Sequence, residues 1–340
     1  MNSFDPPTGM NADGHPAVCV RDVCVRFGST RVLDGVDLSI ARGTVFALLG
    51  ENGVGKTTLI RAMTGYQKFA GSIEVLGRDP SRDRLAIRRE VGYVSDAPPM
   101  YDWMRIDEIG TFAAAFYEPS FAERYRSFIR GYGLNPSQKI RSLSKGQRAK
   151  VALSLAVAHD PDLLIMDEPT SGLDPMVRRD FLESMIDRAA TGRTVFLSSH
   201  QINEVERVAD TVGMLVGGRI RLFGRLDEIK SSIRRVTFDL DDPLVTLPAV
   251  DQDVLLAEQT RGRQRQMIVR GIDDRWRTTM RSAAGVTTMH ESTMSLEDIF
   301  IALTSGLPSQ GDADDRRQTD RYDNGSNGTG TGAMRREISV

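Results

Sequence analysis

The sequence predicts an α/β fold built around a mainly parallel β-sheet. Three apolar runs, at residues 44–49, 163–167 and 194–199, have the composition of buried strands, and helical sequence follows each of them. A glycine-rich loop joins the first run directly to its helix. Strands that alternate with helices in this way are typical of α/β domains.

Two alternating runs precede this core. Residues 17–27 and 31–40 predict an antiparallel pair of strands with a turn at residues 27–30. The only two cysteines, Cys19 and Cys24, lie in the first run, five positions apart. Because an odd offset places side chains on opposite faces of a strand, we expect no disulfide between them. A chain without a cysteine framework favours a reduced compartment.

Composition divides the rest of the chain. Residues 97–150 are rich in aromatic residues and alanine and predict a helical subdomain inserted into the α/β domain, which we place at residues 18–225. Residues 226–305 mix β-like and helical runs and predict a small α+β domain. The two ends, residues 1–17 and 306–340, have compositions that predict disorder.

Charge and hydropathy argue against several classes of protein. Lys plus Arg number 44 and Asp plus Glu number 46, so the formal net charge is −2 and we expect no nucleic-acid partner. The longest apolar runs, such as residues 151–158, are shorter than the roughly 18 residues that a membrane-spanning helix needs. No signal-peptide pattern is present, so we expect a cytoplasmic chain.

Residues 50–57, GENGVGKT, match the phosphate-binding pattern G-x-x-x-x-G-K-[ST] between a predicted strand and a predicted helix. Glycines let backbone N–H groups face phosphate oxygens, and the helix N-terminus adds partial positive charge. We expect Lys56 to hold the β- and γ-phosphates and Thr57 to bind Mg²⁺. The alternative is a glycine-rich turn without a ligand. The nucleotide contacts expected from this loop are Gly50, Asn52, Gly53, Gly55, Lys56, Thr57 and Thr58.

The buried-type run LLIMDE at residues 163–168 ends in two adjacent acidic residues, Asp167 and Glu168. We expect Asp167 to face the metal through water, and Glu168 to orient or deprotonate the water that attacks the γ-phosphate. The alternative is a buried strand that ends in two solvated acids.

The stretch LSKGQR at residues 143–148 lies at the start of a predicted helix. A capping box explains Ser144 and Gln147, which would satisfy backbone groups at the helix N-terminus. It does not explain Gly146, since glycine in a first turn costs about 1 kcal/mol relative to alanine. A capped helix end with an adjacent glycine is therefore a second candidate anion site.

At this point the sequence resembles a known family. LSKGQ resembles the signature of ATP-binding cassette (ABC) ATPases, and other elements of that family follow in the usual order across residues 18–225. Phe27 resembles the aromatic residue that stacks on adenine, although an aromatic at a strand end is more often a packing residue. Residues 171–174, SGLD, resemble the D-loop, and His200 resembles the switch histidine, with a purely structural polar residue as the alternative.

The resemblance implies an ATPase that binds ATP and Mg²⁺ as a head-to-tail homodimer. The phosphate loop of one copy and the signature of the other would enclose each ATP. Glu168, His200 and Lys56 would be catalytic, whereas Ser144 and the N–H of Gly146 would bind the γ-phosphate in trans. Gln147 and the D-loop residue Asp174 complete the implied nucleotide contacts.

Two positions depart from the family pattern. Asp96 stands where a glutamine usually contacts Mg²⁺, and a carboxylate oxygen can still bind this ion. Lys145 stands where glycine is commoner, and we expect its side chain to point to solvent. Outside the motifs, we interpret His159 as a cation near the negative end of a helix dipole.

We therefore expect the ATPase subunit of an ABC transporter, acting on separate integral membrane subunits at the inner face of the cell membrane. Residues 295–304, SLEDIFIALT, are similar to the C-terminal end of ATPase subunits of bacterial exporters, which favours export; the alternative is an amphipathic helix that packs on its own small domain. One rival is a soluble ABC protein of translation or DNA repair, although such proteins usually carry two cassettes or long coiled coils. Another rival, a GTPase, would need the N-K-x-D motif that this sequence lacks.

Overall fold

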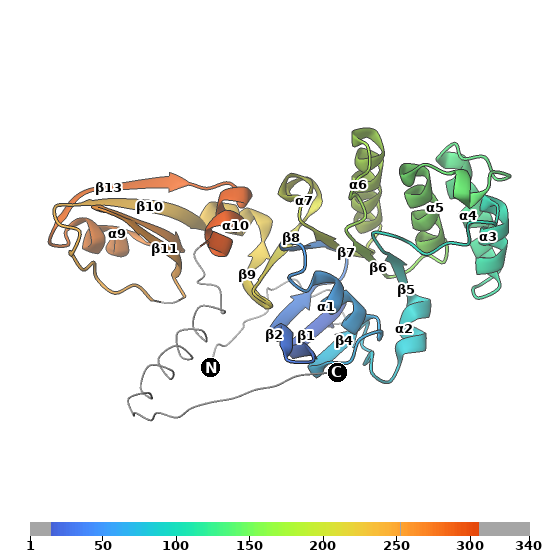
Figure 1. The fold of residues 1–340 in the computed structure, drawn as a ribbon, viewed down its shortest axis with the longest axis horizontal. Helices are drawn as coiled ribbons and strands as arrows, with labels where there is room; N and C mark the ends of the chain where they lie inside the picture. The colour runs from blue at the N-terminus through green and yellow to red at the C-terminus, as the bar shows by residue number, and fades with distance from the viewer. Residues whose placement is uncertain (1–14, 252, 306–340) are drawn as a thin grey trace, which may run out of the picture.

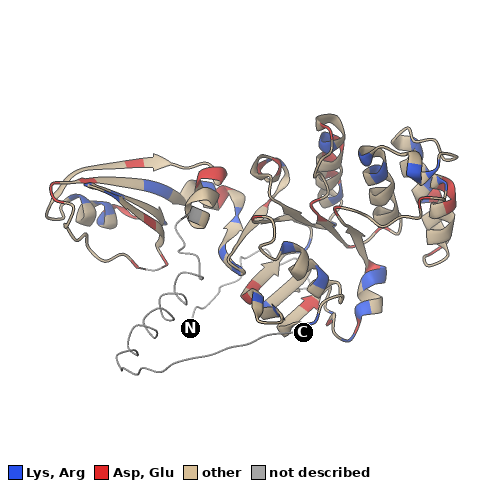
Figure 2. Ribbon diagram, viewed as in Figure 1, with Lys and Arg blue, Asp and Glu red and all other residues tan. Residues whose placement is uncertain are grey.

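The computed structural model describes residues 15–251 and 253–305, which form three β-sheets and their helices (Figure 1). The expected disorder at both ends falls outside the described residues, except at residues 15–17. The helices α3, α4 and α5 lie at one end of the molecule and the strands β10 to β13 at the other, with the central sheet between them (Figure 1). Lys and Arg are interspersed with Asp and Glu over the ribbon (Figure 2).

The central sheet confirms the predicted α/β fold. Five of its strands are parallel, and β9 adds an antiparallel edge beside β8. Every residue of β3, β6 and β7 is buried, as expected for strands covered on both faces. The strand order is β5 (Val91–Val94), β6 (Leu163–Asp167), β7 (Thr194–Ser199), β3 (Val45–Leu49), β8 (Thr211–Val216) and β9 (Arg219–Arg225).

Three helices follow strands of this sheet and lie against it. Apolar residues of the sheet and of these helices belong to two large buried clusters, which cover opposite faces of the strands. Each helix therefore starts where a parallel strand ends, and the intervening loops lie at one edge of the sheet. The helices are α1 (Lys56–Met63), α6 (Pro175–Ala190) and α7 (Ile202–Val208).

A second sheet is antiparallel, with β1 (Val18–Phe27) between β2 (Thr30–Ile40) and β4 (Ala70–Val75). Its central strand corrects one prediction. The buried positions of β1 change from even to odd numbers after Val20, because the pairing is irregular there and Asp22 adopts φ 48°. Cys19 and Cys24 therefore lie on the same face of the strand, not on opposite faces. Both thiols are free.

The predicted helical subdomain is present and has its own small core. Tyr125 lies at its centre, only 2% exposed, and its hydroxyl donates a hydrogen bond of 2.7 Å to the carbonyl of Ile106. Helix α5 also packs on β5, which joins this lobe to the edge of the central sheet. The helices between β4 and β6 are α2 (Arg84–Glu90), α3 (Ile106–Ala114), α4 (Ser120–Gly131), a 3₁₀ turn (Ile140–Ser142) and α5 (Lys145–Val157).

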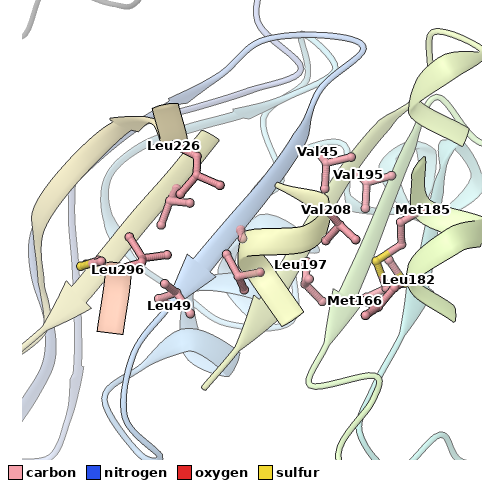
Figure 3. Close-up of a cluster of buried hydrophobic side chains, with 14 of the residues drawn as sticks. Val45, Leu49, Met166, Leu182, Met185, Val195, Leu197, Val208, Leu226 and Leu296 are labelled. Atoms are coloured by element: carbon pink, nitrogen blue, oxygen red, sulfur yellow. The ribbon is translucent and has the colours of Figure 1, made fainter. Parts of the chain in front are cut away.

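The C-terminal part forms a four-stranded antiparallel sheet in the order β11-β12-β10-β13. Its packing is continuous with that of the central sheet, because Leu226 and Leu296 belong to the same buried cluster as Val45 and Leu49 (Figure 3). The last helix packs on α7 and β8 as well as on β11, and so not only on its own small domain. The elements are α8 (Leu226–Ser232), β10 (Ile233–Leu240), β11 (Leu255–Arg261), β12 (Gln264–Arg270), α9 (Asp274–Arg281), β13 (Val286–Thr293) and α10 (Leu296–Ser305).

His159 is not the helix-end cation that the sequence predicts. Its ring stacks on Tyr117, with 4.5 Å between the ring centroids. Burial, followed by the positive charge of Arg188, lowers the pKa of His159 from 6.5 to about 4. The imidazole is therefore neutral near pH 7 and acts as a packing residue.

This low pKa predicts a specific loss of stability in acid. Between pH 6.5 and about 4 the unfolded chain binds a proton at His159 that the folded chain does not, so the free energy of unfolding falls as the pH is lowered through this window. A His159→Phe variant keeps the aromatic stack but has no imidazole to protonate, so it lacks this pH-dependent loss of stability. Relative to wild type it should gain about 1 to 3 kcal/mol between pH 7 and pH 4.5, measured by urea unfolding. A difference between the two proteins that is independent of pH would contradict the burial of a neutral ring.

Candidate functional site

The glycine-rich loop connects the end of β3 to the start of α1, at the centre of the sheet. Gly53 and Gly55 have φ angles of 81° and 116°, which residues with a β-carbon adopt only with strain. A β-carbon on Gly55 would also lie 2.8 Å from a methyl carbon of Leu33 on β2. The chain geometry thus requires glycine at these positions, and it directs the loop toward the N-terminus of α1.

Lys56 reaches back over this loop and is only 5% exposed. Its ammonium donates hydrogen bonds to the carbonyls of Gly50, at 2.7 Å, and Glu51, at 3.1 Å. It also lies 3.0 Å from Oε1 of Glu168. These three oxygens fix the amine at the base of the loop. The other expected nucleotide contacts of the loop lie around it: Asn52, Gly53 and Thr57 are exposed, and Thr58 is half-buried.

The acidic pair lies at the end of the neighbouring strand β6. Asp167 is 4% exposed, and its Oδ1 accepts a hydrogen bond of 2.6 Å from the hydroxyl of Ser198. The same hydroxyl accepts a hydrogen bond of 3.1 Å from the backbone N–H of Glu168. Ser198 therefore fixes both acidic residues, although we did not identify it in the sequence. A polar residue inside the buried run TVFLSS was the available signal.

Glu168 lies between two other predicted catalytic residues. Its Oε1 pairs with Lys56, and its Oε2 lies 2.7 Å from Nδ1 of His200. The backbone of Glu168 adopts φ 49°, a left-handed conformation that is rare for a residue with a side chain and typical of functional sites. The two acids are thus not simply solvated ends of a strand. The geometry presents a carboxylate with a fixed orientation beside a lysine.

Tyr93 on β5 lies within the electrostatic influence of Asp167. Burial, followed by the negative charge of Asp167, raises the pKa of Tyr93 to about 12. Its phenol is therefore uncharged at neutral pH, and it adds no further negative charge next to the acidic pair.

The signature turn has the predicted capping box. Ser144 Oγ accepts a hydrogen bond of 3.2 Å from the N–H of Gln147, and the Gln147 side chain accepts one of 3.0 Å from the N–H of Ser144. Ser144 is exposed, whereas Gly146 is buried. A β-carbon on Gly146 would lie 3.2 Å from a methyl group of Val177 on α6. Close packing of α5 on α6 therefore explains a glycine at position 146 without a ligand, an explanation that our sequence argument did not consider.

Lys145 is exposed, as expected from the sequence. Its ammonium lies 3.9 Å from a carboxylate oxygen of Asp96, whose side chain is 54% exposed. Asp96 and Lys145, the two departures from the family pattern, thus pair with each other. Asp174 caps α6 by accepting hydrogen bonds from the N–H groups of Met176, at 3.1 Å, and Val177, at 3.0 Å.

The predicted site residues thus fall into two groups. The first, defined by the contacts above, contains Lys56, Asp167, Glu168 and His200 at the ends of parallel strands. The second lies at the N-termini of α5 and α6 and contains Ser144, Gly146, Gln147 and Asp174. Phe27, at the end of β1, is 51% exposed. Within the described ranges, no three His, Cys, Asp or Glu side chains form a cluster that could hold a metal ion by themselves.

Comparison with known proteins identifies the family. Residues 33–171 match the family model described as ABC transporter. A daunorubicin resistance ATP-binding protein of Streptomyces coeruleorubidus is 32% identical over 226 residues, which cover 63% of this chain and 70% of that protein. The chain belongs to the ABC transporter ATP-binding proteins. Members of this family are ATPases, and the two groups of residues described above are the candidates for its ATPase site.

Other relatives of this ABC ATPase extend the comparison. An uncharacterized ABC transporter ATP-binding protein of Nostoc sp. is 36% identical over 207 residues, or 59% of this chain and 62% of the relative, which is less than two thirds of its length. A Nod factor export ATP-binding protein of Ralstonia nicotianae is 28% identical over 325 residues, or 88% of this chain and 98% of that protein. A solved ATP-binding subunit of an ABC transporter, 30% identical, superposes with a TM-score of 0.59 over 63% of this chain and 92% of its own.

The position of Asp96 predicts how ATP hydrolysis depends on Mg²⁺. Because this carboxylate pairs with Lys145 in the signature turn, an Asp96→Asn variant should change the Mg²⁺ concentration for half-maximal hydrolysis by less than about twofold. The Asp167→Asn variant is the matched comparison and should raise that concentration at least about tenfold or abolish turnover. Titrations of Mg²⁺ at fixed ATP measure both. Equal effects of the two substitutions would place Asp96 at the metal instead.

Proposed function

We propose that this ABC ATPase binds two ATP molecules at a head-to-tail homodimer interface and drives export through separate membrane subunits. One observation carries the proposal. The residues suited to phosphate binding and hydrolysis gather around Glu168, whereas the exposed, capped turn at Ser144 is a second candidate anion site, on another part of the same chain. If a second copy places its Ser144 turn opposite the residues around Glu168, the turn and these residues can bind the same ATP molecule.

ATP binding would use groups that the chain already holds in place. Backbone N–H groups of the loop at residues 50–57 and the ammonium of Lys56 would bind the β- and γ-phosphates. The γ-phosphate would compete with Glu168 for this ammonium, which lies 3.0 Å from the carboxylate. Thr57 and Asp167 would hold Mg²⁺, which supplies neutralisation of phosphate charge. The exposed hydroxyl and the carboxylate fixed by Ser198 are oxygen ligands of the kind that Mg²⁺ uses together with phosphates.

Hydrolysis would depend on the orientation of Glu168. Its carboxylate would accept a proton from the attacking water or orient that water toward the γ-phosphate. His200, at 2.7 Å through Nδ1, keeps the carboxylate in one orientation and leaves Nε2 for the γ-phosphate. The rigid ends of β6 and β7 support both residues, so little reorganisation is needed at the moment of reaction.

In the dimer, the partner's Ser144 hydroxyl and Gly146 N–H would bind the γ-phosphate, with Gln147 and Asp174 nearby. The exposed ring of Phe27 would stack on adenine. Loss of the γ-phosphate on hydrolysis removes the group that both copies bind, so the halves separate. ATP binding would thereby close the dimer, and hydrolysis would open it.

The relatives support export. The daunorubicin resistance protein and the Nod factor export protein are relatives, and the second match covers 88% of this chain, which takes it beyond the α/β domain. Within the described part of the chain, no helix is both long and apolar enough to cross a bilayer. By analogy with these transporter ATP-binding proteins, we assign the transport pathway to separate integral membrane subunits, with this chain on the inner face of the cell membrane. No observation favours the alternative of a soluble ABC protein in translation or DNA repair.

Replacement of Glu168 by glutamine tests the dimer. The variant keeps the shape of the site but removes the carboxylate that activates water, so turnover should fall at least about 100-fold while ATP binding persists. ATP-bound dimers should then accumulate and be visible by size-exclusion chromatography at millimolar ATP.

The matched control combines Glu168→Gln with Ser144→Arg, which blocks the signature turn and should remain monomeric under the same conditions. Monomeric Glu168→Gln protein at saturating ATP would contradict the proposed assembly.

A further inference from the structure

A partly buried ion pair joins α6 to α7 and takes no part in the reaction described above. Glu204, on α7, is only 5% exposed. One of its carboxylate oxygens accepts a hydrogen bond of 2.5 Å from the hydroxyl of Thr170, and the other lies 3.0 Å from Nε of Arg178 on α6. Thr170 is 2% exposed, so this carboxylate is enclosed by protein.

The guanidinium of Arg178 continues the network in two further directions. It donates one hydrogen bond of 3.1 Å to the side-chain oxygen of Gln201 and another of 3.1 Å to the backbone carbonyl of Leu173. The guanidinium thus contacts three groups through three different nitrogens, two by hydrogen bonds and Glu204 by the ion pair, as its planar fork allows. Arg178 and Glu204 together therefore connect the loop that follows β6 to the loop that follows β7 through side chains with defined orientations.

The connected loops are those that carry the functional residues. Thr170 lies two residues after Glu168, and Gln201 directly follows His200. Leu173 directly precedes Asp174 of the D-loop. A displacement of the D-loop would thus act on Arg178 through the Leu173 carbonyl and reach the His200 loop through Gln201.

Stability alone does not account for a pair of this kind. The cost of removing the Glu204 carboxylate from water offsets much of its attraction to Arg178, so apolar side chains of similar volume often give equal stability. An ion pair with additional hydrogen bonds instead fixes the relative position of the groups that it joins. Here those groups belong to the two loops that flank Glu168.

We propose that Arg178 and Glu204 are positioning residues that couple the D-loop to the His200 loop, so that the orientation of His200 toward Glu168 follows the position of the D-loop. The coupling within one chain rests on the contacts above. Its use as a signal from the second ATP site rests on the proposed dimer, in which the D-loop faces the partner.

An Arg178→Lys variant tests the coupling, since lysine keeps the charge but its single nitrogen cannot replace the three guanidinium nitrogens that contact Glu204, Gln201 and the Leu173 carbonyl. We expect kcat for ATP hydrolysis to fall about tenfold while KM changes by less than about twofold, because the phosphate loop is untouched. Glu204→Gln, which keeps the shape and the acceptor for Thr170, should give the same pattern. Arg179→Lys is the matched control, because Arg179 pairs with Glu183 on the exposed side of α6, and it should leave both constants unchanged.

A double-mutant cycle separates positioning from a general structural defect. In a His200→Ala background, Arg178→Lys should lower the remaining kcat by less than about twofold, because the residue that it positions is absent. All variants are compared below their unfolding transitions. An unchanged kcat in Arg178→Lys, or an equal fold-loss in both backgrounds, would overturn the proposal.

Activity of the wild-type protein as a function of its concentration distinguishes this proposal from the proposed dimer. Specific activity that does not rise with concentration would count against the dimer alone. The cycle with His200 would still decide whether the two loops are coupled within one chain.

Discussion

The arrangement of the site depends on one carboxylate. Glu168 contacts the lysine of the phosphate loop with one oxygen and His200 with the other, and so it joins the ends of three parallel strands. Its position follows from the sheet, because β6 and β7 pair in register and bring Ser198 beside Asp167. The left-handed backbone at Glu168 is tolerated because these contacts over-determine it.

The parts of this site that depend on local backbone geometry could be predicted from the sequence. The phosphate loop needs glycines at positive φ between a strand and a helix, and the capped turn at Ser144 needs its partner at Gln147 three residues later. The runs that form β3, β6 and β7 are apolar throughout because both faces of a parallel sheet are covered. Each of these constraints acts over a few residues and is therefore visible in a single sequence.

The predictions that were wrong or missing depend on contacts between distant segments. The irregular pairing at Asp22 places Cys24 on the same face as Cys19. The valines change from even to odd positions after Val20, a signal that the offset between the two cysteines alone does not show. The neutral state of His159 depends on its stack against Tyr117 and on the charge of Arg188 on α6, both distant in the sequence. The contact between Lys145 and Asp96 likewise joins residues 49 positions apart (145 − 96). Side-chain networks of this kind become visible only when the helices are placed.

A mixing experiment tests the central claim that one chain holds only half of each catalytic pocket. A Lys56→Ala chain lacks the phosphate-loop amine, and a Ser144→Arg chain has a blocked signature turn, so each should be inactive alone. In a head-to-tail heterodimer, one pocket contains both substituted residues. The other pocket contains the intact Lys56 of the Ser144→Arg chain and the intact Ser144 of the Lys56→Ala chain. ATP hydrolysis should therefore reappear when the two purified variants are mixed, and should rise with the fraction of heterodimer. If the mixture remains as inactive as its components, the two loops serve the same chain and the account is contradicted.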